Sequence, residues 1–174
     1  MSYDIYFVRR PADGRWDDVL FDLEGEAGSD RSLQQDELEV WESIVTGVCS
    51  LLPDIESFEG DNNRELTDEA SGIQLFMYSG ELSLSVPYWY SGPEAEALVA
   101  VLRQVVEIVE GKSGLVAFDP QAEGPFLETD ASAAASSFDK VHQSFTERGF
   151  STGQGALPTS TPATGWRRLF NGKS

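Results

Sequence analysis

The sequence predicts an α+β fold: a single, mainly antiparallel sheet with helices packed on one face, in a split β-α-β-like order. Three observations favour this class. Strand-like and helix-like segments alternate along the chain, and a hairpin with a glycine in its turn lies between two long helical segments. In addition, residues 82–86 alternate Leu or Val with Ser, which is typical of a sheet with one covered and one solvated face. Amphipathic helices would supply the cover.

The N-terminal part contains one predicted strand and two predicted helices. Tyr3–Val8 is aromatic and β-branched and ends shortly before a proline, as a strand does. Apolar residues then recur at helical spacing over 16–23, which predicts a short helix. A longer helix is expected to begin at Ser32, with Gln35 three residues later as in a capping box, and to end at Pro53.

The middle of the chain contains the hairpin. Ile55–Phe58 is expected to form a short strand and Gly60–Asp68 a polar loop. Ile73–Tyr78 and Leu82–Val86 are predicted strands, joined through Ser79-Gly80-Glu81. If the short strand only decorates an edge, the remainder resembles a split β-α-β arrangement in which the hairpin separates two crossover helices.

The C-terminal part of the predicted domain repeats the helix–strand alternation. Gly92-Pro93 opens a second long helix with a broad apolar stripe, and Gly114 ends it. Leu115–Phe118 is expected to be a strand. Asp130 then caps a final helix, Ala131–Glu147.

A tail of different composition follows this domain of residues 1–148. Residues 149–174 are rich in Gly, Ser, Thr and Pro and lack periodicity, so a flexible, disordered tail is expected. Near its end lies a short basic-aromatic motif: Trp166, Arg167, Arg168, Leu169 and Phe170. The motif either binds an acidic surface, such as that of this protein itself, or serves as a short linear motif for another protein; the alternative is an ordinary flexible terminus.

The charge of the chain is lopsided. It carries 30 acids and 12 bases, a formal net charge of −18. Residues 149–174 contribute +3, so residues 1–148 carry −21. Such a field repels nucleic acid and anionic membranes and accelerates the encounter with a basic protein. A basic protein, such as a toxin, is therefore the expected partner.

The acids are densest over residues 13–61, where 15 acids accompany 2 bases. Within this stretch, four acids on the polar side of the first long helix are candidates for docking a basic partner: Asp36, Glu37, Glu39 and Glu42. The alternative is a solvated helix face that only keeps the protein in solution.

An aromatic run and a turn aspartate are the other candidates. Pro87 places the end of its strand at a sheet edge or outside the sheet. Tyr88, Trp89 and Tyr90 should then point to both sides, with at least one ring exposed, to anchor a protein interface or stack on a sugar. Alternatively, these rings close one end of the core. Asp119 precedes a proline directly after a predicted strand, where either a functional loop or an ordinary turn is expected.

The sequence offers little for catalysis or for a cofactor. Cys49 is the only cysteine and lies in an apolar run, so a buried thiol is expected; His142 is the only histidine and is expected on a helix surface. Residues 61–72 mimic the start of a calcium loop but lack its glycine and its bidentate glutamate. The N-terminus lacks a secretion signal and the chain lacks a run long enough for a membrane span, so the cytoplasm is expected.

Three segments together resemble a known group of proteins. Tyr3–Val8 after Ser2, the run Tyr88-Trp89-Tyr90 and the turn Phe118-Asp-Pro-Gln121 are similar to those of small acidic uncharacterised actinobacterial proteins. The likeness covers about residues 1–147 and carries no catalytic residues. Such proteins resemble the immunity proteins of bacterial toxin systems in size, acidity and α+β build, and this analogy implies an inhibitor that binds a toxin.

Three functional hypotheses follow. The leading one is a non-enzymatic protein-binding module, an immunity or antitoxin-type inhibitor whose acids rim the contact and whose aromatics anchor it. The second is a small-molecule or sugar-binding module, or a minor enzyme, that uses Tyr88, Trp89, Tyr90 and Asp119. The third is a structural or regulatory protein tethered by its tail.

Overall fold

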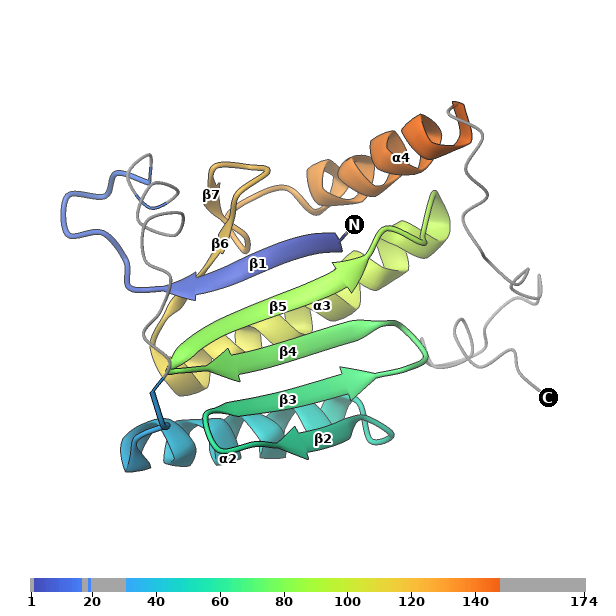
Figure 1. The fold of residues 1–174 in the computed structure, drawn as a ribbon. Coiled ribbons are helices and arrows are strands. Elements are labelled where there is room, and N and C mark those ends of the chain that lie inside the picture. Colours follow the sequence, from blue (N-terminus) through green and yellow to red (C-terminus); the bar gives the residue numbers. More distant parts are fainter. Residues whose placement is uncertain (1, 17–18, 20–30, 148–174) are drawn as a thin grey trace.

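The computed structural model describes residues 2–16, 19 and 31–147, except the side chains of residues 145 and 146. Within these residues the chain forms one sheet and three helices (Figure 1). The elements are, in chain order, β1 (Ser2–Val8), α2 (Gln35–Leu51), β2 (Glu56–Glu59), β3 (Asn63–Asp68), β4 (Ile73–Tyr78), β5 (Glu81–Pro87), α3 (Pro93–Ser113), β6 (Val116–Asp119), β7 (Gly124–Pro125) and α4 (Ala131–Glu147).

The sheet has the order β2-β3-β4-β5-β1-β6-β7, and all its neighbouring strands are antiparallel. α3 connects β5 and β6, which flank β1, so this half is a split β-α-β unit. α2 connects β1 to the edge strand β2, from which β3 leads back to β4 beside β5. One antiparallel sheet with helices confirms the predicted α+β class.

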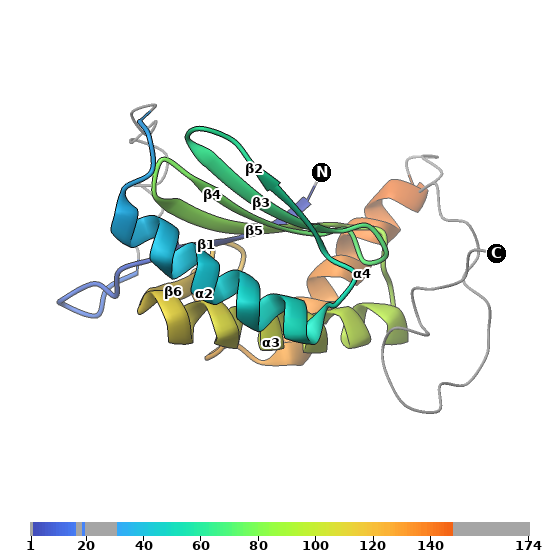
Figure 2. The same cartoon turned by 90° about the horizontal axis from the view of Figure 1, so that it is seen from below.

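The helices lie against one face of the sheet (Figure 2). Tyr3, Ile5 and Phe7 of β1 are buried on this face, while the residues between them are partly exposed. α2 buries Trp41, Ile44 and Val48 in the same core. α4 joins it through Phe138, whose ring stacks on Tyr3 with 5.0 Å between the ring centroids.

Several local predictions are confirmed. The hairpin turn consists of Ser79 and Gly80, with φ angles of 50° and 90°, as a two-residue type I′ turn requires. α3 begins at Pro93 and ends before Gly114, whose φ of 70° is that of a left-handed helix cap. Asp130 caps α4, because its Oδ1 accepts the backbone N–H of Ser132 at 2.8 Å.

The predicted polar loop over 60–68 is wrong, because Asn63–Asp68 forms the strand β3. The segment lacks apolar alternation, since only Leu66 and Asp68 among its residues are buried. Its place between β2 and β4 supplies ladder hydrogen bonds on both sides, so pairing decides the structure where hydrophobicity does not. The two-residue strand β7 was not predicted either.

Other predictions concern residues outside the described part of the chain or differ from the structure. Most of the predicted helix over 16–23 and all of the tail over 149–174, with its motif Trp166–Phe170, lie outside the described residues. Cys49 is partly exposed rather than buried. Among the helices of the described chain, none combines the length and the apolar character that crossing a membrane requires.

Candidate functional site

One face of the sheet has no described helix against it, and we call it the open face. It presents the side chains that alternate with the buried ones. The strand register aligns them in two rows: Asp4, Ser85, Gln74, Thr67 and Glu56 in the first, and Tyr6, Ser83, Phe76, Glu65 and Phe58 in the second. Tyr78 and Glu81 lie opposite each other next to the second row.

The open face is acidic. Asp4, Glu56, Glu65 and Glu81 occupy strand positions on it, and no lysine or arginine occupies such a position in the described strands. Facing strands that carry acids without bases create a negative potential across the surface. This potential favours contact with a cationic partner.

The same face carries exposed aromatic side chains. Phe58 is 57% exposed, Trp89 50% and Tyr78 43%, and they are the large hydrophobic side chains that the described chain leaves most exposed. Aromatic rings of this kind often anchor protein interfaces. Acids and aromatics therefore share one surface.

The β6 end of the face is covered by the chain itself. Phe118 is fully buried there, under the stacked ring of Trp16 at 5.6 Å between centroids. The Arg10 guanidinium lies 5.7 Å from the centroid of the Trp16 ring and pairs with Glu128 at 2.8 Å. The open face is thus covered over β6, whereas its side chains over β1 to β5 remain partly or fully exposed.

A shallow groove of about 570 Å³ lies beside Trp89 on this face. Its walls carry hydroxyl and amide groups, a proline and a carboxylate: Ser2, Thr67, Glu69, Gly72, Gln74, Ser85, Pro87 and Trp89. Gly72 has a φ of +71°, and a Cβ there would lie 2.8 Å from Pro87 Cγ and 3.3 Å from the Trp89 ring. Only glycine allows this close approach without strain.

Trp89 is held by two buried neighbours. The Tyr88 hydroxyl donates to Gln121 Oε1 at 2.8 Å, and the Tyr90 hydroxyl donates to the carbonyl of Ser71 at 2.9 Å. Burial raises the pKa of both tyrosines, so both stay neutral at ordinary pH. The expectation that the run points to both sides with one ring exposed is confirmed, and the exposed ring is Trp89.

Asp119 lies inside the protein, 1% exposed. Its Oδ2 accepts the Tyr3 hydroxyl and its Oδ1 accepts the backbone N–H of Gln121 at 2.8 Å. Burial, then the hydrogen bond to Asp119, raises the pKa of Tyr3 well above its usual value. With Tyr88, these residues join the three segments that carry the sequence resemblance into one buried cluster, so their role in this chain is structural.

The acids of α2 lie on the other side of the molecule. Asp36, Glu39 and Glu42 are exposed, whereas Trp41 and Ile44 turn the opposite side of the helix towards the sheet. The structure therefore does not bring these acids together with Trp89. They cannot rim a contact that Trp89 anchors, unless a partner wraps around the domain.

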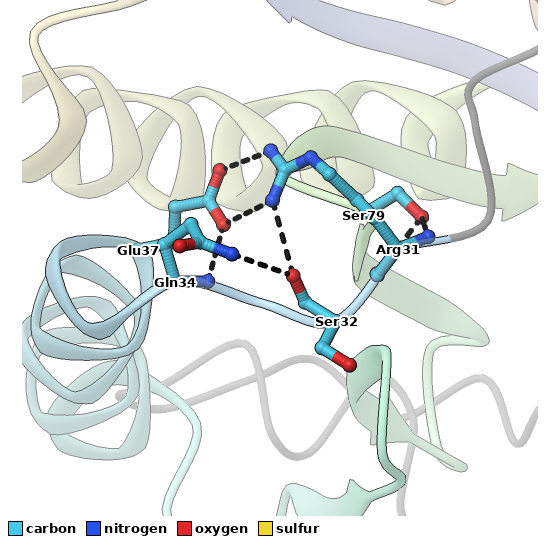
Figure 3. Close-up of polar contacts among 5 residues, drawn as sticks. All are labelled: Arg31, Ser32, Gln34, Glu37 and Ser79. Atoms are coloured by element: carbon cyan, nitrogen blue, oxygen red, sulfur yellow. Dashed lines mark hydrogen bonds and ion pairs between the residues drawn. The ribbon is translucent and has the colours of Figure 1, made fainter.

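Glu37 is already engaged within the chain (Figure 3). Its carboxylate accepts two hydrogen bonds from the Arg31 guanidinium, at 2.6 and 2.9 Å, and the backbone N–H of Gln34 at 2.7 Å. The hydrogen bonds from Arg31 hold the pKa of Glu37 below its usual value. The predicted cap of Ser32 with Gln35 is wrong, because Gln34 and Glu37 cap the helix.

The same cluster ties α2 to the hairpin. The Ser79 hydroxyl oxygen accepts the Arg31 N–H at 3.2 Å and donates to the Arg31 carbonyl at 3.3 Å (Figure 3). Because Ser79 lies in the β4–β5 turn, these contacts fix the start of α2 against the sheet.

Among the described residues, no three His, Cys, Asp or Glu side chains converge to hold a metal ion. His142 lies partly exposed on α4. The sequence missed Phe58 and Tyr78 as surface aromatics, although the acids on both sides of Phe58 could have indicated an exposed strand.

Comparison with known proteins found no match for this chain among family models, curated proteins or solved structures.

Proposed function

We propose that the protein is a non-enzymatic binding module that recognises a basic protein through its open face, as an immunity or antitoxin-type inhibitor does. One observation carries the proposal: the open face combines strand-borne acids, without strand-borne bases, with the exposed rings of Phe58, Tyr78 and Trp89. We place the protein in the cytoplasm, where such an inhibitor would meet a toxin.

The chemistry of the face favours arginine and lysine in the partner. An arginine can stack on an exposed aromatic ring while its guanidinium donates to a nearby carboxylate. Glu65 and Phe58 are opposite neighbours in the register, as are Tyr78 and Glu81, so ring and carboxylate occur in pairs. A partner with several cations at this spacing would gain both contacts at once.

The net charge of −18 adds a long-range contribution. Charge of one sign raises the association rate of a partner of the opposite sign without needing direct contact. The α2 acids Asp36, Glu39 and Glu42 contribute to this field from the far side of the sheet. In this proposal the α2 acids accelerate the approach of the partner, and the open face holds it.

The experiment is affinity purification from the source cells with the full chain and with a Trp89→Ala chain. We expect the wild-type chain to retain a basic protein that the variant loses, because the anchor ring is gone. Thr46→Ala, an exposed change on α2, serves as the control that leaves retention unchanged.

The salt dependence of the purified complex provides the second readout. From about 0.01 M to about 0.15 M salt the Debye length falls from about 30 Å to about 8 Å, so association should slow. A retained partner that is acidic, or one that Trp89→Ala retains as well as the wild type, would contradict the proposal.

The groove beside Trp89 favours one second candidate, a neutral sugar. Hydroxyl and amide groups on its walls can hydrogen-bond sugar hydroxyls, and an exposed indole can stack on the ring of a sugar. A thermal-shift series with neutral mono- and disaccharides tests it, because a ligand that binds only the native state raises the melting temperature. No shift at millimolar sugar would remove this candidate.

A further inference from the structure

We propose that the outer edge of β2 binds the partner by strand addition, taking up an extended segment with lysine or arginine at alternate positions. This inference rests on the proposed function and names the part of the basic partner that docks. It assigns a site to a sheet edge, next to the open face but distinct from it.

β2 is the last strand of the sheet on its side. All four of its residues, Glu56–Glu59, are exposed, and no other described strand pairs with its outer side. An edge strand presents a row of backbone N–H and C=O groups that can pair with another chain. Peptides that bind in this way obtain affinity from main-chain hydrogen bonds and specificity from their side chains.

The hydrogen-bond pattern shows which backbone groups face outwards. The Gly60 N–H donates to the Asn63 carbonyl at 2.9 Å, so these two residues form a hydrogen-bonded pair of the β2–β3 ladder. In an antiparallel ladder such pairs alternate with non-bonded pairs. Phe58 therefore points its backbone groups at β3, whereas Ser57 and Glu59 point theirs at the outer edge.

The hydrogen bonds between β3 and β4 support this assignment. The Ser79 N–H donates to the Asn62 carbonyl at 3.0 Å in the β3–β4 register. Alternation then directs the backbone groups of Arg64 and Leu66 towards β4, leaving those of Glu65 for Phe58 of β2. Two independent hydrogen bonds thus indicate that the backbone groups of Ser57 and Glu59 face away from β3.

Charge decides what kind of strand the edge takes. Glu56, Glu59 and Asp61 are exposed along it. The nearby Arg64 guanidinium donates to the carbonyls of Gly60 and Asn63, so it is engaged in closing the turn. Charges opposite each other across strands interact directly, and opposite signs stabilise the pair.

A second copy of this chain does not fit the edge. Antiparallel pairing of two β2 strands would bring the exposed acids Glu56, Glu59 and Asp61 of one chain close to those of the other, and two chains that each carry a net charge of −18 repel each other. A strand whose alternate cations point to the open-face side instead places one of them beside Glu56. Another would lie beside the exposed ring of Phe58 on the same side, where a cation–π contact adds to the pairing.

Ser57→Pro in the full chain tests the proposal, with Ser57→Ala as the matched control. Proline removes the outward N–H but none of the β2–β3 hydrogen bonds, and edge strands tolerate it. Alanine removes only the hydroxyl. The probe is an acetylated, amidated peptide of alternating lysine and valine, about ten residues long to span a strand.

We expect the peptide to bind the wild-type chain and Ser57→Ala alike, with slowed amide exchange at Ser57 and Glu59. Ser57→Pro should bind the peptide about tenfold more weakly or worse, because one hydrogen bond is lost and the proline ring adds bulk at the edge. With the lysines on the open-face side, the valine N–H groups of the peptide face Ser57 and Glu59. A peptide N-methylated at its valines should therefore not bind the unmodified chain, which keeps the test valid even if Ser57→Pro fails to fold.

Equal binding to Ser57→Pro and the wild type, equal binding of the N-methylated peptide, or no binding of the peptide to the wild type would each overturn the strand-addition proposal. The broader proposal is separable. If a basic partner is retained by the wild type and by Ser57→Pro but lost with Trp89→Ala, docking on the open face stands and strand addition fails.

Discussion

At the scale of single residues, burial separates structural side chains from those available to a partner. Asp119 is an acid on a turn, but its two oxygens accept Tyr3 and Gln121 inside the protein. An acid that is buried and hydrogen-bonded on both oxygens stabilises the fold and cannot meet a partner. Trp89 shows the opposite case, since its buried neighbours in sequence leave its ring half exposed.

Tyr3→Phe should destabilise the fold and change its alkaline unfolding. Losing the hydroxyl removes a buried donor to Asp119, which costs about 1–3 kcal/mol at neutral pH. The pKa of Tyr3 is raised in the folded protein, so its contribution is complete below about pH 10, the pKa of an unfolded tyrosine, and decreases as the pH rises further. The variant should therefore lose less stability above pH 10, by about 1.4 kcal/mol per pH unit.

Urea unfolding followed by circular dichroism between neutral and strongly alkaline pH measures this slope. Ile5→Val, a change in the same strand without a titrating group, should lower stability by a similar amount at every pH. A slope that is the same for Tyr3→Phe and the wild type would contradict the buried role of the hydroxyl.

At the scale of elements, the start of α2 is fixed by contacts from outside the helix. Arg31 precedes the helix, Glu37 lies in its first turn, and Ser79 belongs to the distant hairpin turn. The Glu37 carboxylate accepts a backbone N–H at the start of the helix and also pairs with Arg31. At least one of the acids of this helix, Glu37, therefore stabilises the fold of the chain itself.

Glu37→Gln should lower stability by about 1 kcal/mol at pH 7, because the cap remains partly satisfied but the charged pair is lost. The pKa of Glu37 is lowered in the folded state, so its contribution is present above about pH 4.3 and is lost as the pH falls. The difference from the wild type should accordingly shrink as the pH is lowered towards 3.

Chemical denaturation at pH 7 and at about pH 3, below the unfolded glutamate pKa, checks this. Glu42→Gln on the exposed side of α2 is the control and should stay within about 0.5 kcal/mol of the wild type. If both substitutions had equal effects, Glu37 would have no special place in the cap.

At the scale of the whole molecule, the sheet separates two acidic surfaces. The open face carries acids with aromatic rings, and the outer side of α2 carries acids without exposed rings. Long-range attraction to the proposed basic partner would sum over both surfaces, whereas direct contact would involve only the open face. Association and dissociation of a complex should therefore depend on different residues.

Replacing Asp36, Glu39 and Glu42 together with lysine should slow association with a basic partner about tenfold at low salt and leave dissociation nearly unchanged. Trp89→Ala should instead accelerate dissociation, because it removes a contact. Surface plasmon resonance at two salt concentrations separates the two rates. Faster dissociation of the lysine variant would show that α2 itself touches the partner.

The sequence by itself determined the elements whose signals are local. The alternation of residues 82–86, the turn at Ser79-Gly80 and the glycines around Pro93–Ser113 each act within a few residues, so the hairpin and the long helices could be predicted. From these the fold class followed. Of the candidate site, the exposure of one ring in the aromatic run was also predicted, because Pro87 cannot donate to a ladder and was expected to end its strand just before the run.

Only the tertiary structure decided which surfaces exist. Asn63–Asp68 becomes a strand through pairing on both sides, and Asp119 becomes internal through Tyr3, far away in the sequence. The sheet also places the α2 acids on one side and Trp89 on the other, although the sequence suggested one contact. Whether a side chain is buried, and on which side of the sheet it lies, depends on residues far away in the sequence, so a short-range pattern cannot predict it.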